Sequence, residues 1–186
     1  GLEAFAIRVN KEGERETPFI KSPPIRQIAA PTTLSGAEFS DLSGCVDKKT
    51  QVKQLFSSSE IGPAAVILDP EITVHTPEDL WLSTGVRALD HAVETLSSSE
   101  AMPIADAGAL HAIRLLSESL PVNKANPYDL DKRLDSQMAI ALACMGLNRV
   151  AYGASHGIGH QLGAVAGVPH GYTSCILLPH VMAFNQ

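Results

Sequence analysis

The pattern of apolar and polar positions changes in character near Thr76. Before this point, short apolar stretches alternate with clusters of proline, serine, glycine and charged residues. Such punctuated stretches are typical of short strands joined by turns. The sequence therefore predicts strands at residues 4–9, 25–30 and 64–68.

Beyond Thr76, apolar residues recur at helical spacing, as in Leu89, Val93 and Leu96. Thr76 is followed by Pro77 and two acidic residues, which predicts a helix start with Thr76 as the capping residue. Helices are predicted over residues 78–83, 85–97, 103–118, 128–150, 154–166 and 171–184. The 128–150 stretch is apolar on much of its surface, so we expect it to be a central buried helix.

Composition narrows the class of protein. The chain has 186 residues, of which 45% are hydrophobic and 18% charged, as expected for a globular protein with a sizeable core. A net charge of -6 and scattered basic residues argue against nucleic-acid binding. No apolar run approaches the roughly 20 residues of a membrane span. The three cysteines are far apart and form no CxxC pair, which favours reduced thiols and a cytoplasmic location.

Histidines provide the candidate chemistry. Four of the seven histidines fall within a short stretch near the end of the chain, and His156 and His160 stand at i and i+4. On a helix these two imidazoles face the same way, which is metal-ligand spacing. Gly157 stands where a hydrolytic zinc motif would have glutamate, so a metalloprotease is excluded. His170 lies between proline and glycine at a predicted turn, from which it can point back at this face.

Several motifs together resemble the iron-containing (group III) alcohol dehydrogenase family. The similar segments are residues 31–38 with Pro-Thr-Thr, 84–94, 153–163 with Ser-His-Gly-Ile-Gly-His, 169–171 with Pro-His-Gly, and 177–182. Each motif is moderately specific, whereas their order and spacing together are strongly so. The resemblance covers roughly residues 23–186.

The resemblance implies a fold of the dehydroquinate synthase-like and iron-containing alcohol dehydrogenase type, here incomplete. Residues 1–76 would be an α/β remnant, the C-terminal part of a dinucleotide-binding domain, and residues 77–186 an all-α metal and substrate domain that is truncated at its C-terminal end. It also implies hydride transfer between NAD or NADP and a carbonyl or alcohol, with iron or zinc polarising the oxygen. The partner would be a small-molecule substrate, and the family tendency is towards homodimers.

Individual roles follow from the matching positions. The resemblance assigns metal binding to His91, His156 and His170, and a proton-relay role to His160. It assigns cofactor contacts to Thr32, Thr33 and Lys53.

The chain departs from the family pattern at three places. Arg87 occupies the position of a ligand aspartate, and a guanidinium cannot ligate a cation, which argues against metal binding. The segment from Thr32 to Glu38 is one residue shorter than in typical members, as in the maleylacetate reductase branch, where the substrate is a carboxylic acid. Arg87 is therefore a candidate catalytic residue that binds a carboxylate or polarises a carbonyl. No glycine-rich phosphate loop precedes Pro31.

Two further function classes stay open on this sequence. One is a non-redox enzyme, such as a dehydratase, isomerase or cyclase, that reuses the histidine and arginine pocket of the helical domain. The other is a catalytically silent binding or assembly module. Failure of the protein to bind NAD(P) would favour either of these over the oxidoreductase.

Overall fold

The computed structural model describes residues 2–21, 24–50, 52–100 and 102–186, without the side chain of residue 53. The chain forms two compact units. The first contains residues 1–29 and 37–66, and the second contains residues 30–36 and 67–186. The segment 30–36 thus belongs with the helices although it lies among the strands in sequence.

Short strands make up the first unit, as the sequence predicts. The described strands pair two by two: β1 (Arg8–Val9) with β2 (Arg15–Glu16) antiparallel, β3 (Ile28–Ala29) with β6 (Ala65–Val66) parallel, and β4 (Leu42–Val46) with β5 (Lys53–Ser57) antiparallel. Two 3₁₀ helices, η1 (Leu2–Phe5) and η2 (Ala37–Phe39), complete it. The strand predicted at residues 4–9 is therefore confirmed only at Arg8–Val9, and η1 takes up residues 4–5.

The hairpin of β4 and β5 was not predicted. Its connection is an Asx-type turn, in which the Asp47 carboxylate accepts hydrogen bonds from the Lys49 backbone N–H at 2.8 Å and the Thr50 hydroxyl at 3.0 Å. These local bonds lower the pKa of Asp47. Asp-x-x-Thr after a short apolar run is a recognisable turn signal.

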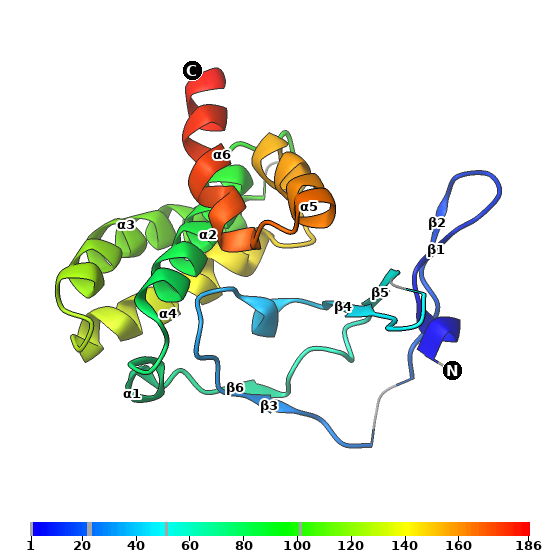
Figure 1. Ribbon diagram of the computed structural model, residues 1–186, viewed down its shortest axis with the longest axis horizontal. Coiled ribbons are helices and arrows are strands. Elements are labelled where there is room, and N and C mark those ends of the chain that lie inside the picture. Colours follow the sequence, from blue (N-terminus) through cyan, green and yellow to red (C-terminus); the bar gives the residue numbers. More distant parts are fainter. Residues whose placement is uncertain (1, 22–23, 51, 101) are drawn as a thin grey trace. The chain divides into compact units, whose positions relative to one another are not determined.

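Helices make up the second unit (Figure 1). They are α1 (Pro70–Thr73), α2 (Glu78–Leu96), α3 (Pro103–Ala125), α4 (Leu130–Ala143), η3 (Cys144–Gly146), α5 (Ala154–Ala166) and α6 (His170–Phe184). Helix α2 is the centre of this unit, because it contacts α3, α4, α5 and α6. It therefore has neighbours on most of its sides, and its polar residues are buried along with its apolar ones.

One continuous helix, α2, replaces the two helices predicted at residues 78–83 and 85–97. Gly85 does not interrupt it, because this glycine serves close packing: a Cβ there would lie 2.5 Å from a methyl group of Leu120. The predicted cap by Thr76 is also wrong. Pro77 precedes the helix without a side-chain cap, and the Thr76 hydroxyl donates instead to the Thr32 carbonyl at 2.6 Å.

The predicted helix at residues 128–150 is shorter and less buried than expected. Asp129 caps α4 by accepting from the Lys132 N–H at 3.0 Å, and the α-helix ends at Ala143. Leu134 and Met138 are exposed, whereas the buried face contains Arg133, Ser136 and Gln137. Helix α3 in turn continues past the predicted end at residue 118, through Pro121.

Arg133 joins three elements inside the unit. Its guanidinium donates to the backbone carbonyls of Thr73 at 2.9 Å and Pro127 at 2.5 Å. It also stacks over the Trp81 ring, 4.4 Å from the centroid. Because all three contacts satisfy a buried cation without a carboxylate, Arg133 fixes α1 and the start of α4 against α2.

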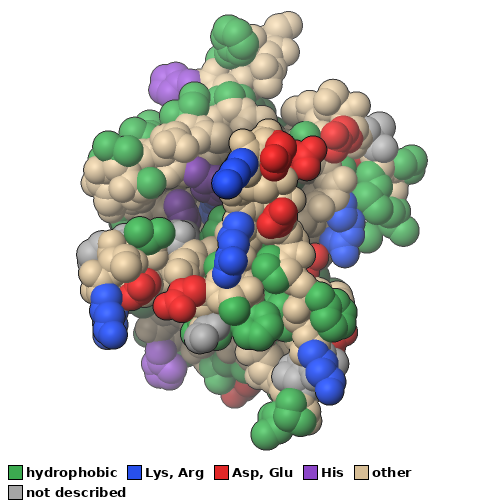
Figure 2. All heavy atoms as spheres, turned by 90° about the vertical axis from the view of Figure 1, so that its right-hand side faces the viewer, with side chains coloured by type: hydrophobic (Ala, Val, Ile, Leu, Met, Phe, Trp, Pro, Cys, Tyr) green, Lys and Arg blue, Asp and Glu red, His purple; other side chains and the backbone are tan. Residues whose placement is uncertain are grey.

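Two further observations concern the described helices and the distribution of charge on the surface. Among the described helices, none is both long and apolar enough to cross a membrane. Figure 2 shows acidic and basic side chains interspersed on the face that it displays, in keeping with the absence of a basic stripe from the sequence.

Candidate functional site

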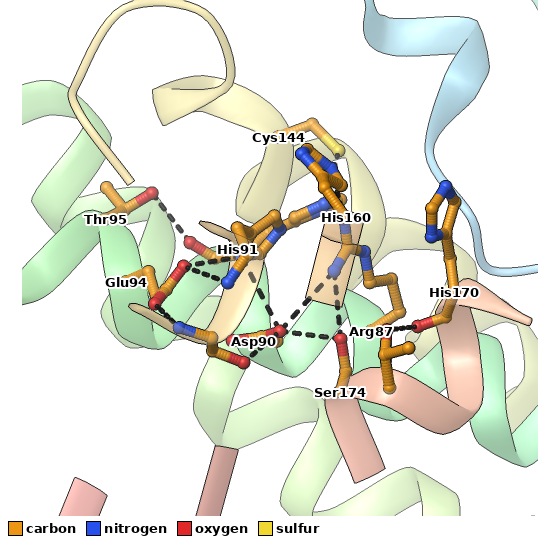
Figure 3. Close-up of polar contacts among 12 residues, drawn as sticks. Arg87, Asp90, His91, Glu94, Thr95, Cys144, His160, His170 and Ser174 are labelled. Atoms are coloured by element: carbon orange, nitrogen blue, oxygen red, sulfur yellow. Dashed lines mark hydrogen bonds and ion pairs between the residues drawn. The ribbon is translucent and has the colours of Figure 1, made fainter. Parts of the chain in front are cut away.

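Five side chains that the sequence singles out come together in the helical unit (Figure 3). Arg87 and His91 project from α2, His156 and His160 from α5, and His170 from the first turn of α6. The ring centroids of His91 and His156 are 4.8 Å apart, those of His156 and His160 6.1 Å, and those of His160 and His170 5.5 Å. The structure thus forms a continuous row of imidazoles with Arg87 beside it.

The row runs from the interior to the surface. His91 and His156 are buried, whereas His160 and His170 are exposed. Burial lowers the pKa of His91 well below its ordinary value, and the charges of His156, Arg87 and His160 lower it further. His91 is therefore neutral near pH 7, and His160 and His170 form the exposed end of the row.

Glu94 holds the start of α5. Its carboxylate accepts from the backbone N–H groups of Ser155 at 2.8 Å and His156 at 3.2 Å, and from His156 Nδ1 at 2.5 Å. Because a carboxylate only accepts, His156 Nδ1 must bear a proton in this contact. Nε2 is buried without a hydrogen-bond partner among the described residues. Gly153 fits this arrangement, since a Cβ there would lie 3.0 Å from Glu94 Oε1.

The pKa of Glu94 reflects these contacts. Burial alone raises it, but the hydrogen bond and charge of His156 and the two backbone N–H groups lower it by more. The net pKa lies below the ordinary glutamate value. Glu94 is consequently an ionised, buried cap that also orients the His156 ring.

Arg87 lies between the imidazole row and a buried carboxylate. One guanidinium nitrogen, Nη1, donates to the Ser174 hydroxyl at 3.1 Å and lies 3.7 Å from Asp90 Oδ2. The other, Nη2, lies 3.4 Å from His160 Nε2, and because arginine has no acceptor, His160 Nε2 must accept this bond. Burial lowers the pKa of Arg87, and Asp90 and Glu94 raise it in part.

The aspartate beside Arg87 is completely buried. Asp90 Oδ2 accepts from the Ser155 hydroxyl at 2.8 Å and from the Ser174 hydroxyl at 2.6 Å. The sequence offers Asp90 and Glu94 as ion-pair partners for Arg87, and the structure confirms the pair with Asp90. Their spacing of three and seven residues from Arg87 places all three on one face of α2, and this signal was available in the sequence.

A divalent metal does not fit this group. Asp90, Glu94 and His156 offer ligand atoms within 4.8 Å of one another. However, Glu94 accepts three hydrogen bonds, and Asp90 accepts two and has the Arg87 guanidinium 3.7 Å away. A dication roughly 4 Å from a guanidinium would be repelled by roughly 8 kcal/mol at an effective dielectric constant of about 20. Asp90 Oδ1 and His156 Nε2 are buried without a hydrogen-bond partner among the described residues, but the Arg87 guanidinium already supplies a positive charge beside Asp90.

The predicted cofactor residues lie in two places. Thr32 and Thr33 belong to the helical unit, where the Leu34 N–H donates to the Thr84 hydroxyl at 3.1 Å and anchors the loop to α2. The buried Leu34 side chain strengthens this anchor. Lys53 lies in β5 of the other unit, and its side chain is outside the described part of the chain. Its role in cofactor binding stays a prediction, as do the roles of Thr32 and Thr33.

Known proteins resemble this chain over most of its length. Residues 81–186 match the model of the Fe-containing alcohol dehydrogenase family, C-terminal part. Dehydrogenase ALT3 of Alternaria alternata is 40% identical over 183 residues, which cover 89% of this chain and 46% of that protein. The NAD-dependent methanol dehydrogenase of Bacillus methanolicus is 35% identical over 167 residues, with 89% and 44% covered.

A crystal structure of maleylacetate reductase from Agrobacterium tumefaciens superposes with a TM-score of 0.80 at 33% identity, covering 86% of this chain and 45% of that one. The predicted fold class is confirmed by this match. The chain spans less than half the length of each of these three relatives.

Proposed function

The chain belongs to the iron-containing alcohol dehydrogenase family, and on that basis we propose that it is part of an NAD(P)-dependent oxidoreductase that transfers hydride between nicotinamide and a carbonyl or alcohol. Residues 1–76 would contribute to the dinucleotide-binding domain, with Thr32, Thr33 and Lys53 as cofactor contacts. Residues 77–186 would supply the substrate site. A cytoplasmic location and a homodimer are part of the same proposal.

The contact between Arg87 and His160 is the observation that supports this function best. Arg87 Nη2 lies 3.4 Å from His160 Nε2, so a fixed cation and a neutral imidazole stand side by side. His160 is exposed, which lets it contact a substrate and exchange protons with water. A charged donor beside a proton acceptor is the pair of groups that alcohol oxidation requires.

The proposed step uses these two residues directly. In alcohol oxidation, His160 would accept the hydroxyl proton, and the alcohol oxygen would become a carbonyl oxygen. Arg87 donates hydrogen bonds to that oxygen and stabilises its negative charge as the proton leaves. In the reverse direction protonated His160 returns the proton. The nicotinamide supplies or accepts the hydride.

This scheme needs no metal, in contrast to the family name. The Arg87 guanidinium takes the role that a Lewis acid would have, because it is a permanent cation beside the reacting oxygen. His91, His156 and His170, assigned to a metal by resemblance, would instead shape the pocket and orient one another. For His156 this is supported by its bond to Glu94, which fixes the ring.

Arg87 also offers a basis for substrate preference. Its paired N–H groups suit a carboxylate as well as a carbonyl, and we propose an acidic substrate. The test compares Arg87→Ala and Arg87→Lys on an acidic and a neutral aldehyde of equal chain length, succinic semialdehyde and butanal. A carboxylate role predicts a loss of kcat/KM about tenfold larger for the acidic aldehyde, corresponding to one charge-assisted bond of roughly 1.4 kcal/mol. Equal losses on both substrates would exclude that role.

A non-redox enzyme is the second candidate, and one observation favours it. The Arg87 and His160 pair lies wholly within the helical unit, so acid–base chemistry at this site requires no nicotinamide. Titration of NAD⁺ and NADP⁺ into the polypeptide that contains this sequence separates the two candidates. Binding of either nucleotide supports the oxidoreductase, and the absence of binding supports the non-redox alternative.

A further inference from the structure

A completely buried carboxylate stands behind the proposed catalytic arginine. Asp90 lies one helical turn from Arg87 on α2, with Oδ2 3.7 Å from Arg87 Nη1. The same oxygen accepts from Ser155 on α5 and from Ser174 on α6. One carboxylate oxygen therefore ties three helices together at the point where Arg87 leaves its helix, as Figure 3 shows for Arg87, Asp90 and Ser174.

The direction of each hydrogen bond in this group is fixed. Arginine only donates, so the Ser174 oxygen accepts from Arg87 at 3.1 Å. An ionised carboxylate only accepts, so the Ser174 hydroxyl donates to Asp90 at 2.6 Å. Ser174 is thus a one-way link from guanidinium to carboxylate. Ser155 also donates to Asp90, but it lies on a different helix, and the side-chain hydrogen bonds of the described residues include none between it and Arg87.

Charge gives a second reason for the arrangement. Arg87 is 8% exposed, and an unpaired buried guanidinium is costly. Glu94 is unsuited to balance it, since its oxygens accept from His156 and two backbone N–H groups. Asp90 has the nearest carboxylate oxygen to Arg87 among the described ion pairs. It neutralises the buried end of the guanidinium and leaves Nη2 directed at His160.

We infer that Asp90 is a positioning residue for Arg87, acting through Ser174, and that the Asp90 charge moderates the preference of the site for acidic substrates. This inference rests on the proposed role of Arg87 in substrate binding. The aspartate fixes which face of the guanidinium meets the substrate. It also offsets part of the positive charge that a substrate carboxylate would experience.

The serines provide a matched pair of variants. Ser155→Ala and Ser174→Ala each remove one hydroxyl from Asp90 Oδ2 at a fully buried position, but only Ser174 contacts Arg87. Ser174→Ala should lose at least as much stability towards urea as Ser155→Ala, because its hydroxyl also accepts from Arg87. Only Ser174→Ala should free the Arg87 side chain, which ¹⁵N NMR detects as averaging of its Nη signals, assigned with Arg87→Lys. This readout needs no substrate.

Kinetics then test the consequence. We expect Ser174→Ala to lower kcat/KM about tenfold on whichever of succinic semialdehyde and butanal is the better substrate, because a misplaced guanidinium loses transition-state contacts. The kcat/KM of Ser155→Ala should stay within about twofold of the wild-type value. Asp90→Asn should lower both rates but raise the ratio of acidic to neutral kcat/KM about tenfold, since a nearby negative charge is gone.

Two outcomes would overturn the inference. The first is equal Nη averaging and equal rate loss in the two serine variants, which would make Asp90 a purely structural link. The second is an unchanged substrate ratio in Asp90→Asn. The proposed function fails by a different result, namely Arg87→Ala with undiminished activity. Altered Nη signals in Ser174→Ala alone would then still support the positioning role.

Discussion

The carboxylate of Glu94 gives the sharpest prediction for stability. Replacing it with alanine removes the acceptor for two backbone N–H groups at the start of α5 and for His156 Nδ1. Glu94 is 3% exposed, so water cannot readily replace it. A lost helix cap costs about 1 kcal/mol, and removing one partner of a buried charged pair costs about 3–5 kcal/mol. We therefore expect Glu94→Ala to lower the free energy of unfolding by about 4 kcal/mol.

Glu100 offers a matched control near the same loop. Its carboxylate also accepts from a backbone N–H, that of Ala151 at 3.0 Å, but this contact is exposed. Glu100→Ala should cost less than about 1 kcal/mol. Urea unfolding at pH 7 compares the two variants, and amide hydrogen exchange shows whether α5 loses protection first.

The pH dependence supplies an internal check. The folded-state pKa of Glu94 is lowered, so its contribution is complete above the unfolded pKa of 4.5 and is lost as pH falls through the lower folded-state value. The difference between wild type and Glu94→Ala should therefore shrink below about pH 4.5. Equal losses for Glu94→Ala and Glu100→Ala at pH 7, or unchanged exchange in α5, would refute the capping argument.

Three further predictions follow from the buried site and its surroundings. Because the folded-state pKa of His91 lies well below the ordinary 6.5, the unfolded chain binds more protons below that pH. The free energy of unfolding should therefore fall by up to about 1.4 kcal/mol per pH unit as the pH drops below about 6.5. Urea titrations between about pH 6.5 and 4.5, above the range in which Glu94 titrates, should show a steeper slope in wild type than in His91→Phe. In thermal unfolding, Gly36→Ala should destabilise the protein by about 2 kcal/mol, because φ is +76° and the added Cβ would lie 2.5 Å from Cys144 Sγ. Gly13→Ala, where φ is +84° and the surrounding space is open, should cost about 1 kcal/mol. Equal effects of the two substitutions would contradict the packing argument. Elemental analysis should find no stoichiometric iron or zinc, and a chelator should leave Tm unchanged; a metal at one equivalent would overturn the metal-free scheme.

Helix boundaries show where local sequence suffices. Helix α5 occupies the predicted residues 154–166, and α6 begins one residue before the predicted start at 171. The helices predicted separately at residues 78–83 and 85–97 form one helix, in which Gly85 packs closely against the Leu120 side chain. Helix propensity describes how a residue affects its own backbone conformation. The packing of Gly85 depends instead on Leu120, which lies 35 positions further along the chain.

The residues of the histidine row could be predicted from the sequence, but their hydrogen-bond partners could not. Spacing placed His156 and His160 on one face, and the family resemblance added His91 and His170. The partners that define their chemistry were missed. Ser155 and Ser174 bond to one Asp90 oxygen across 65 and 84 residues, and no periodicity along the chain encodes such contacts.

The sequence by itself determined the fold class, the family and the presence of Arg87 in place of a ligand aspartate. The fold class and the family depend on the order and spacing of motifs that resemble a known family, and the presence of Arg87 depends on residue identity, all of which can be read along the chain. Only the tertiary structure decided which groups the Arg87 guanidinium contacts. Packing of α2 against α5 and α6 buries Asp90 and Glu94 beside it, and burial makes each unpaired polar group costly. Because of that cost, Arg87 is paired with Ser174 and Asp90, and His156 is paired with Glu94. Partners at many other separations along the chain could have met the same need, so the sequence alone does not identify them.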